Sequence, residues 1–190
     1  IYTSDQGFFL GDHGWYDKRF MYEESLRSPL IVRYPREIRA GTTCDAMTLS
    51  LDYAPTFLDF GGFDPATAHE AMHHEMQGAS LRPLMQSPST PPGDWRPSIY
   101  YHYYESGEPH TVPKHYGVRT ERYKLIRFYE LAGGPEAQYE FYDLKTDPHE
   151  LRNLYTDDAA SPNGRIIAEL KAKLGRLREQ YHDTTGAPMP

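Results

Sequence analysis

The second half of the chain carries the clearest pattern of apolar and polar positions. Three stretches are rich in aromatic and β-branched residues and partly alternate: SIYYHYYES (98–106), HYGVRTERYKLIRFYE (115–130) and YEFYDLKTD (139–147). We expect them to form three antiparallel strands with one face exposed to water. Further on, RIIAELKAKLGRLREQY (165–181) places its apolar residues along one stripe of a helix. This half therefore predicts a small α+β unit, a sheet with a helix laid across it.

The first half predicts fewer regular elements. They are, in order, a strand end at 1–4, a glycine-rich loop at 5–19, a short helix at 20–26, a buried strand at 29–35, a helix at 50–62 and an irregular connection at 63–98. Two short strands and one long helix are too few to close a core of their own. We therefore expect that sequence before Ile1 completes this part of the fold.

Composition and charge exclude several classes of function. The chain has 190 residues and a formal net charge of −7, which argues against a general nucleic-acid binder because phosphate backbones require clustered Lys and Arg. No apolar run approaches the roughly 20 residues of a membrane span. The single cysteine, Cys44, excludes an internal disulfide framework and a multi-cysteine metal site.

Candidate chemistry is concentrated near the start of the chain. Asp5 and Gln6 follow the expected strand end, and their side-chain oxygens are hard ligands suited to Ca²⁺ or Mg²⁺. His13 and Lys18 add groups that could hold a tetrahedral oxyanion. Taken singly, the same residues are compatible with a turn after a strand, a polar loop and a solvated lysine.

The whole string TSDQGFFLGDHGWYDKRFMYEESLRSPLIVRYP (3–35) resembles the late part of the catalytic domain of type I sulfatases, within the alkaline phosphatase superfamily. The shared pattern is a strand, S-D-(N/Q/H)-G, a G-(D/E)-H-G loop, a lysine and Y-E-E-S-L-R-x-P-L. QGASLRPLM (77–85) and YEFYDLKTDPHELRNLY (139–155) are similar to later segments of the same family. The resemblance covers essentially the whole chain, and its string is nearest to bacterial-type sulfatases that act on carbohydrates.

The resemblance implies an α/β fold. Residues 1–94 would be the C-terminal portion of an alkaline-phosphatase-like mixed-sheet domain, and residues 95–190 a small α+β subdomain. It implies that Asp5 and Gln6 are two ligands of an active-site calcium, with Mg²⁺ as the alternative metal. It also implies that Lys18 contacts the substrate sulfate and that His13 lies in the adjacent loop.

The nucleophile of the family is a formylglycine made from the Cys or Ser of a C/S-x-P-x-R motif. Cys44 stands in T-T-C-D-A-M, without that proline and arginine, so the nucleophile is expected upstream of Ile1. We therefore expect a sulfatase fragment that is inactive alone, has the missing N-terminal part of its catalytic domain as a partner and acts on a sulfated carbohydrate. The resemblance favours a periplasmic or secreted location.

Four residues of the second half are candidates for contact with the substrate, namely His102, His110, His115 and Arg119. Sulfated sugars are bound by Arg and His donors and by aromatic walls. The alternative is that each belongs to an ordinary sheet surface.

Three other functions remain open. A phosphonate monoester hydrolase or phosphodiesterase of the same superfamily would share the late metal and loop patterns. A non-catalytic glycan-binding or packing module would need no missing half. HEAMH (69–73) formally matches a zinc-protease motif, but it lies in an irregular stretch without an evident third ligand.

Overall fold

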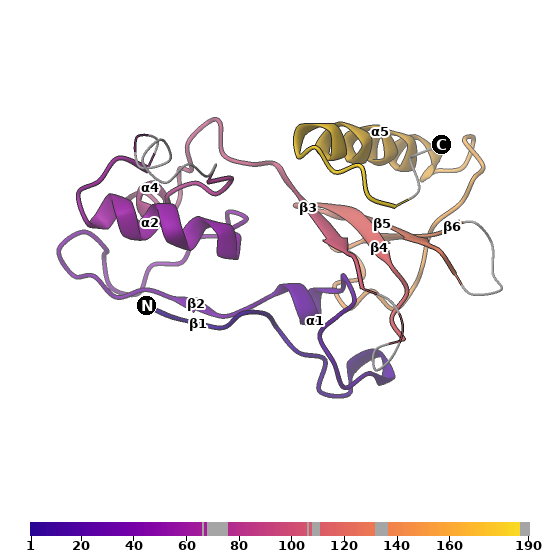
Figure 1. Cartoon of the computed structure of the whole chain (residues 1–190), viewed down its shortest axis with the longest axis horizontal. Helices are drawn as coiled ribbons and strands as arrows, with labels where there is room; N and C mark the ends of the chain where they lie inside the picture. Colours follow the sequence, from indigo (N-terminus) through magenta and orange to yellow (C-terminus); the bar gives the residue numbers. More distant parts are fainter. Residues whose placement is uncertain (66, 68–75, 106, 108–110, 132–136, 187–190) are drawn as a thin grey trace. The chain divides into compact units, whose positions relative to one another are not determined.

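A computed structural model describes residues 1–190 except 66, 68–75, 106, 108–110, 132–136 and 187–190. The chain divides into two compact units (Figure 1). The first contains residues 1–5 and 30–96, and the second contains residues 6–29 and 97–190. The sequence predicted domains at 1–94 and 95–190, and these bounds stay a prediction. The compact units differ from them in that residues 6–29 group with the second unit.

The first unit consists of a small ribbon and short helices. Strands β1 (Tyr2–Thr3) and β2 (Leu30–Ile31) pair antiparallel, and the helical segments are η2 (Ser50–Asp52), α2 (Tyr53–Phe60) and α4 (Arg82–Gln86). The sequence predicted a buried strand at 29–35, which is wrong: β2 has only two residues, and Ile31 is 63% exposed. The residues of α4 were expected to lie in an irregular connection, but they form a short helix. Pro83 stands in its first turn, where a proline is tolerated.

A buried carboxylate fixes the start of the helical segment in this unit. Asp52 is fully buried, accepts hydrogen bonds from the backbone N–H groups of Leu49 and Ala79, and pairs with both terminal nitrogens of Arg96 at 2.6 Å. Gly78 allows the close approach that this requires, since a Cβ there would lie 2.0 Å from the carbonyl oxygen of Leu51. The Q-G-A-S segment is thereby held against the first turn of the helix.

The second unit is built on a four-stranded antiparallel sheet. Its strands are β3 (Ser98–Tyr103), β4 (His115–Thr120), β5 (Tyr123–Tyr129) and β6 (Ala137–Asp143), in that spatial order. The stretch 115–130, expected to be one strand, is a hairpin that turns at Glu121 and Arg122, which corrects the expected three strands to four. Thr120 closes the turn, because its hydroxyl bonds both the N–H and the C=O of Tyr123.

Both faces of this sheet are covered, which corrects the expectation of one wet face. Helix α5 (Gly164–Gln180) packs Ile167, Leu170 and Leu174 against one face, and Figure 1 shows α1 (Glu23–Leu26) on the other side. The second face receives buried apolar side chains from residues 9–22: Phe9, Phe20, Met21 and Tyr22. The segment that carries the sulfatase-like string therefore forms a core with the C-terminal sheet.

No helix in the described residues is long and apolar enough to cross a membrane.

Candidate functional site

Asp5 and Gln6 follow strand β1, as the sequence predicts. Asp5 is exposed and belongs to the first unit, whereas Gln6 is half-buried and belongs to the second. Gly7 comes next and donates its N–H to the carbonyl of Ser25 at 2.8 Å. Only glycine fits here, since a Cβ would lie 2.0 Å from the carbonyl oxygen of Glu24. The chain entering the loop is thus clamped against helix α1.

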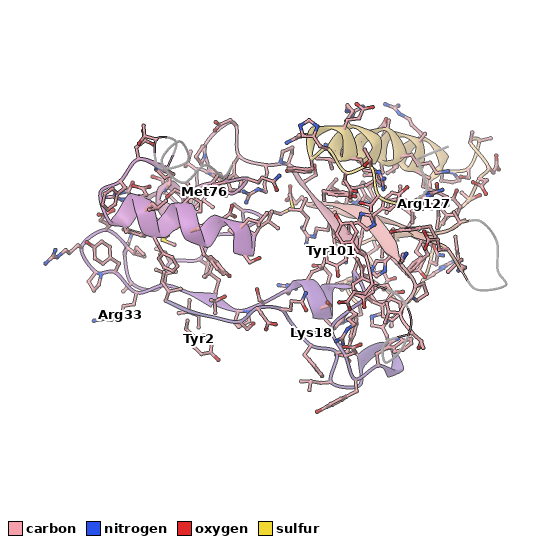
Figure 2. The ribbon with its side chains drawn as sticks, viewed as in Figure 1. Tyr2, Lys18, Arg33, Met76, Tyr101 and Arg127 are labelled. Atoms are coloured by element: carbon pink, nitrogen blue, oxygen red, sulfur yellow. The ribbon has the colours of Figure 1, made fainter. Side chains whose placement is uncertain are left out.

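The loop that carries His13 and Lys18 is closed by its own backbone. The Phe9 N–H donates to the carbonyl of Asp17 at 2.9 Å, and the short helix η1 (Asp12–Gly14) forms its tip. Lys18 is fixed at both backbone groups: its N–H donates to the Asp17 carboxylate at 2.7 Å, and its C=O accepts from the Ser25 hydroxyl. Figure 2 shows Lys18 in the segment leading to α1.

His13 contacts two residues at the start of α1, the ring of Tyr22 and the carboxylate of Glu24. Its ring stacks on Tyr22 with centroids 4.5 Å apart, and its Nε2 atom is 3.3 Å from Oε2 of Glu24. Nδ1 of His149 lies 3.6 Å from the other oxygen of Glu24. The imidazole is only 12% exposed, so its orientation is set by these neighbours.

A buried charge network anchors α1 to the sheet. Nζ of Lys124 lies 2.9 Å from Glu23 and 2.7 Å from Glu150, and all three residues are buried. Glu150 also accepts a hydrogen bond from the backbone N–H of Glu23 at 2.6 Å. Arg119, a predicted substrate residue, bonds the Glu23 carboxylate at 3.1 and 3.3 Å. The two carboxylates are matched by two cations.

Burial and charge act in opposite directions on these carboxyl groups. Burial raises the pKa of Glu23, but the charges of Lys124 and Arg119 outweigh it, so that its pKa lies below the usual value. Burial dominates at Glu150 and raises its pKa, with Lys124 opposing. Glu150 also adopts a positive φ of 51°, an uncommon conformation for glutamate. Sequence reasoning missed this network; its signal was a lysine inside the apolar strand Y-K-L-I.

The predicted sugar-binding histidines have buried rings. His102 places Nδ1 2.6 Å from Asp183 and Nε2 2.6 Å from the Tyr129 hydroxyl, with a side chain 1% exposed. His115 is fully buried, and its Nδ1 donates to the carbonyl of Pro113 at 2.8 Å. Phe20, Tyr101, Tyr103 and Phe128 surround the His115 ring.

The burial of both rings favours a packing role over contact with a sugar. Burial also lowers the pKa of His115 to about 4. His110 lies outside the described residues, as do His69, Glu70 and His73 of the zinc-like motif. The substrate-contact assignments of His102, His110, His115 and Arg119 stay predictions.

Comparison with known proteins identifies the family. The family described as N-sulphoglucosamine sulphohydrolase, C-terminal, matches residues 11–180. The chain belongs to this family. The sulphohydrolase match confirms the sulfatase resemblance and spans both the loop with Lys18 and the C-terminal sheet.

One curated relative and two solved structures are similar to this chain. It is 46% identical to an N-acetylglucosamine-6-O-sulfatase from Bacteroides thetaiotaomicron, over 96% of this chain and 30% of the relative. A solved structure in complex with its substrate D-glucosamine-2-N,6-O-disulfate has a TM-score of 0.84 at 46% identity, covering 97% of this chain and 34% of that one. A phosphonate monoester hydrolase of Agrobacterium radiobacter has a TM-score of 0.74 at 24% identity, covering 95% of this chain and 35% of that one, and shares the fold alone.

These matches confirm the α/β, alkaline-phosphatase-like fold class predicted from the sequence. The chain spans about a third of the length of the solved relative and 30% of the curated one.

The metal ligands predicted from the sequence can be compared with the donors that calcium requires. The carboxylate of Asp5 and the carboxamide of Gln6 are oxygen donors of the kind that calcium takes. Within the described ranges, no group of three or more His, Cys, Asp and Glu side chains could hold a metal ion. Calcium requires about six to eight oxygen ligands, so two donors would supply a minority of them. The convergence of Asp5, Gln6 and Lys18 at one site stays a prediction.

Proposed function

We propose that this chain is the C-terminal part of a carbohydrate sulfatase, a hydrolase of sulfate esters on an amino sugar. The observation that carries the proposal is the 46% identity to an N-acetylglucosamine-6-O-sulfatase across 96% of this chain. The solved relative with a sulfated glucosamine substrate supports the same substrate class. Because the chain spans only about a third of these relatives, the activity is assigned to a longer protein in which an N-terminal part completes the site.

Lys18 is the residue of this chain that we assign to the substrate. Its ammonium group would donate to a sulfate oxygen and offset the negative charge that develops on the transferring group. The backbone bonds to Asp17 and Ser25 fix the position from which that side chain extends. His13, held against Tyr22 and Glu24, is assigned to the wall of the same loop.

Asp5 and Gln6 are assigned to the metal, with Ca²⁺ as the first choice and Mg²⁺ as the second. A bound divalent cation would supply positive charge at the sulfate oxygens. A formylglycine nucleophile, expected from the family, would come from the N-terminal part. Cys44 is exposed, and its sequence context gives it no part in this assignment. A periplasmic or secreted location belongs to the same proposal.

Two other functions remain to be tested against this one. A phosphonate monoester hydrolase is favoured by the common fold alone. A non-catalytic glycan-binding module is favoured by the well-packed second unit, which has buried clusters on both faces of its sheet.

The deciding experiment uses the longer protein that carries this chain. We expect it to release sulfate from N-acetylglucosamine-6-sulfate and to cleave an aryl phosphonate far more slowly. Lys18→Ala should lower kcat/KM for the sulfate ester by about 10² to 10³, the range for loss of one transition-state donor. Lys173→Ala, a lysine of α5, is the matched control and should leave kcat/KM unchanged.

Cleavage of the phosphonate alone would refute the sulfatase assignment in favour of the phosphonate hydrolase. Equal activity of Lys18→Ala and the control would remove Lys18 from the site. Tight sugar binding with no turnover of either ester would favour the glycan-binding module.

A further inference from the structure

A cleft with a volume of about 500 Å³ opens on the surface of the second unit. It is bordered by the residue after α1, the turn between β4 and β5, and the segment after β6. Its polar lining consists of Arg27, Arg119, Arg122, Lys145, Glu23 and Glu121. The volume lies within the range of small-molecule sites and is sufficient for a sugar ring and its substituents.

The cleft gathers positive charge in an acidic chain. Four of its lining side chains are cationic, although the whole chain has a net charge of −7. Arg122 is bound in a bidentate pair with Asp143 at 2.7 and 2.9 Å. Within the part of the chain that the structure describes, no carboxylate pairs with the side chain of Arg27 or Lys145.

Arg119 adds a guanidinium that is paired with a carboxylate of the buried network. Its guanidinium bonds the Glu23 carboxylate at 3.1 and 3.3 Å, but that carboxylate also lies 2.9 Å from the buried ammonium of Lys124. Because Lys124 also pairs with Glu150 at 2.7 Å, the network holds two cations and two carboxylates. Arg119 is oriented by this bond, and its side chain is 21% exposed.

We propose that this cleft binds a sulfate group of a sulfated oligosaccharide. The inference rests on the proposed function, because it names a binding site for the same class of substrate. A guanidinium presents paired N–H donors that match two oxygens of a tetrahedral anion, and a lysine adds a point charge. Leu144 and Pro148 also line the cleft and offer apolar surface to the C–H face of a sugar ring.

The carboxylate of Glu121 makes the proposal testable in both directions. Glu121 is exposed, lines the same cleft and opposes any anion that enters. Neutralising a cation of the cleft should therefore weaken binding, and neutralising Glu121 should strengthen it. A general preference of the protein surface for anions would not depend on which of these residues is changed.

The experiment titrates the 190-residue chain with a sulfated heparin tetrasaccharide by calorimetry, and with the same tetrasaccharide after complete desulfation. We expect Arg27→Met and Lys145→Met each to weaken binding about two- to fivefold, which is the effect of one exposed charge contact. Glu121→Gln should tighten binding by a similar factor. Arg176→Gln, an exposed arginine of α5 outside the cleft, is the matched control and should leave the affinity unchanged.

Equal weakening by Arg176→Gln, or equal affinity for the desulfated sugar, would overturn the proposal, as would the absence of binding. Inorganic sulfate is a further arm, and saturation by it at the affinity of the tetrasaccharide would show that the cleft does not recognise a sugar. The altered side chains are surface groups, so unchanged denaturation midpoints will show that each variant folds.

This binding experiment is independent of turnover. Sulfate release by the longer protein without cleft-dependent binding would refute the inference and leave the proposed function standing. Cleft-dependent binding by the chain, with no sulfate release by the longer protein, would do the reverse.

Discussion

Replacing Lys124 with methionine tests the buried network directly. The substitution keeps an unbranched side chain but removes the ammonium group that lies within 2.9 Å of Glu23 and 2.7 Å of Glu150. Glu23 then keeps Arg119 as its partner, whereas buried Glu150 loses the ammonium group that lay 2.7 Å away. Removing one member of a buried ion pair costs about 3–5 kcal/mol, because an uncompensated charge is left behind. That would be a large part of the stability of a domain of this size, about 5–15 kcal/mol.

The pH dependence of this loss provides a second signature. Without Lys124 the pKa values of both carboxyl groups should rise. Burial acts to raise both pKa values, and the ammonium group that opposes this effect at each carboxyl group is gone. An acid with a raised pKa in the folded state binds its proton more tightly there, so it destabilises the fold above that pKa and less below it. The deficit of Lys124→Met should therefore be largest near pH 7 and shrink as the pH falls toward the ordinary glutamate pKa.

Urea denaturation of the chain at pH 7 and pH 5 measures both effects. The matched control is Arg165→Gln, which breaks the exposed pair with Glu169 and should cost no more than about 0.5 kcal/mol. The double variant Lys124→Met/Glu150→Gln should recover part of the loss, since glutamine removes one charge and keeps the acceptor for the Glu23 N–H. A cost equal to that of the control, or one that does not change with pH, would refute the network as a determinant of stability.

Three further predictions concern the second unit. Gly117→Ala should destabilise the fold by about 1–3 kcal/mol, because the new Cβ would lie 2.5 Å from the Leu125 carbonyl and 2.6 Å from the Met21 sulfur. At Gly175 in α5 a new Cβ would meet no atom within 4 Å, so Gly175→Ala should stabilise the fold by about 0.5–1 kcal/mol. Equal changes in the free energy of unfolding for the two variants would contradict this packing. His115, whose pKa burial lowers to about 4, should make stability fall as the pH drops from about 6.5 toward 4. His115→Asn should flatten that slope, and an unchanged slope would assign it to other groups.

The sequence predicted the elements that carry strong local signals. Helix 165–181 was read from its apolar stripe and is observed as Gly164–Gln180. The turn at Glu121 and Arg122 was missed, because it contains none of the glycine, asparagine or proline residues that mark turns, and its closure by Thr120 uses a side chain. The covered second face was missed for another reason: the residues that cover it come from positions 9–22, about a hundred residues earlier.

The candidate site also has a part that the sequence predicted and a part that it did not. Asp5, Gln6, His13 and Lys18 could be named because they form one contiguous string that resembles a family. The Glu23, Lys124 and Glu150 network could not, because its members come from three distant segments and only the lysine inside Y-K-L-I gave a local signal. Local patterns therefore gave the candidate chemistry, whereas the contacts that hold it are long-range pairings that periodicity does not encode.

The position of Lys18 follows from these long-range contacts. Ser25 bonds the Lys18 carbonyl through its hydroxyl and the Gly7 N–H through its own carbonyl, so α1 fixes both ends of the loop. Helix α1 is in turn held to the sheet by Glu23 and Lys124. Packing is discrete rather than continuously deformable, so a change at the sheet should reach Lys18 through α1. On the proposed function, Lys124→Met in the longer protein should therefore lower kcat for the sulfate ester under conditions where the variant is still folded, although Lys124 is fully buried. If folded Lys124→Met enzyme kept the full kcat, the loop would hold Lys18 in place without help from the sheet.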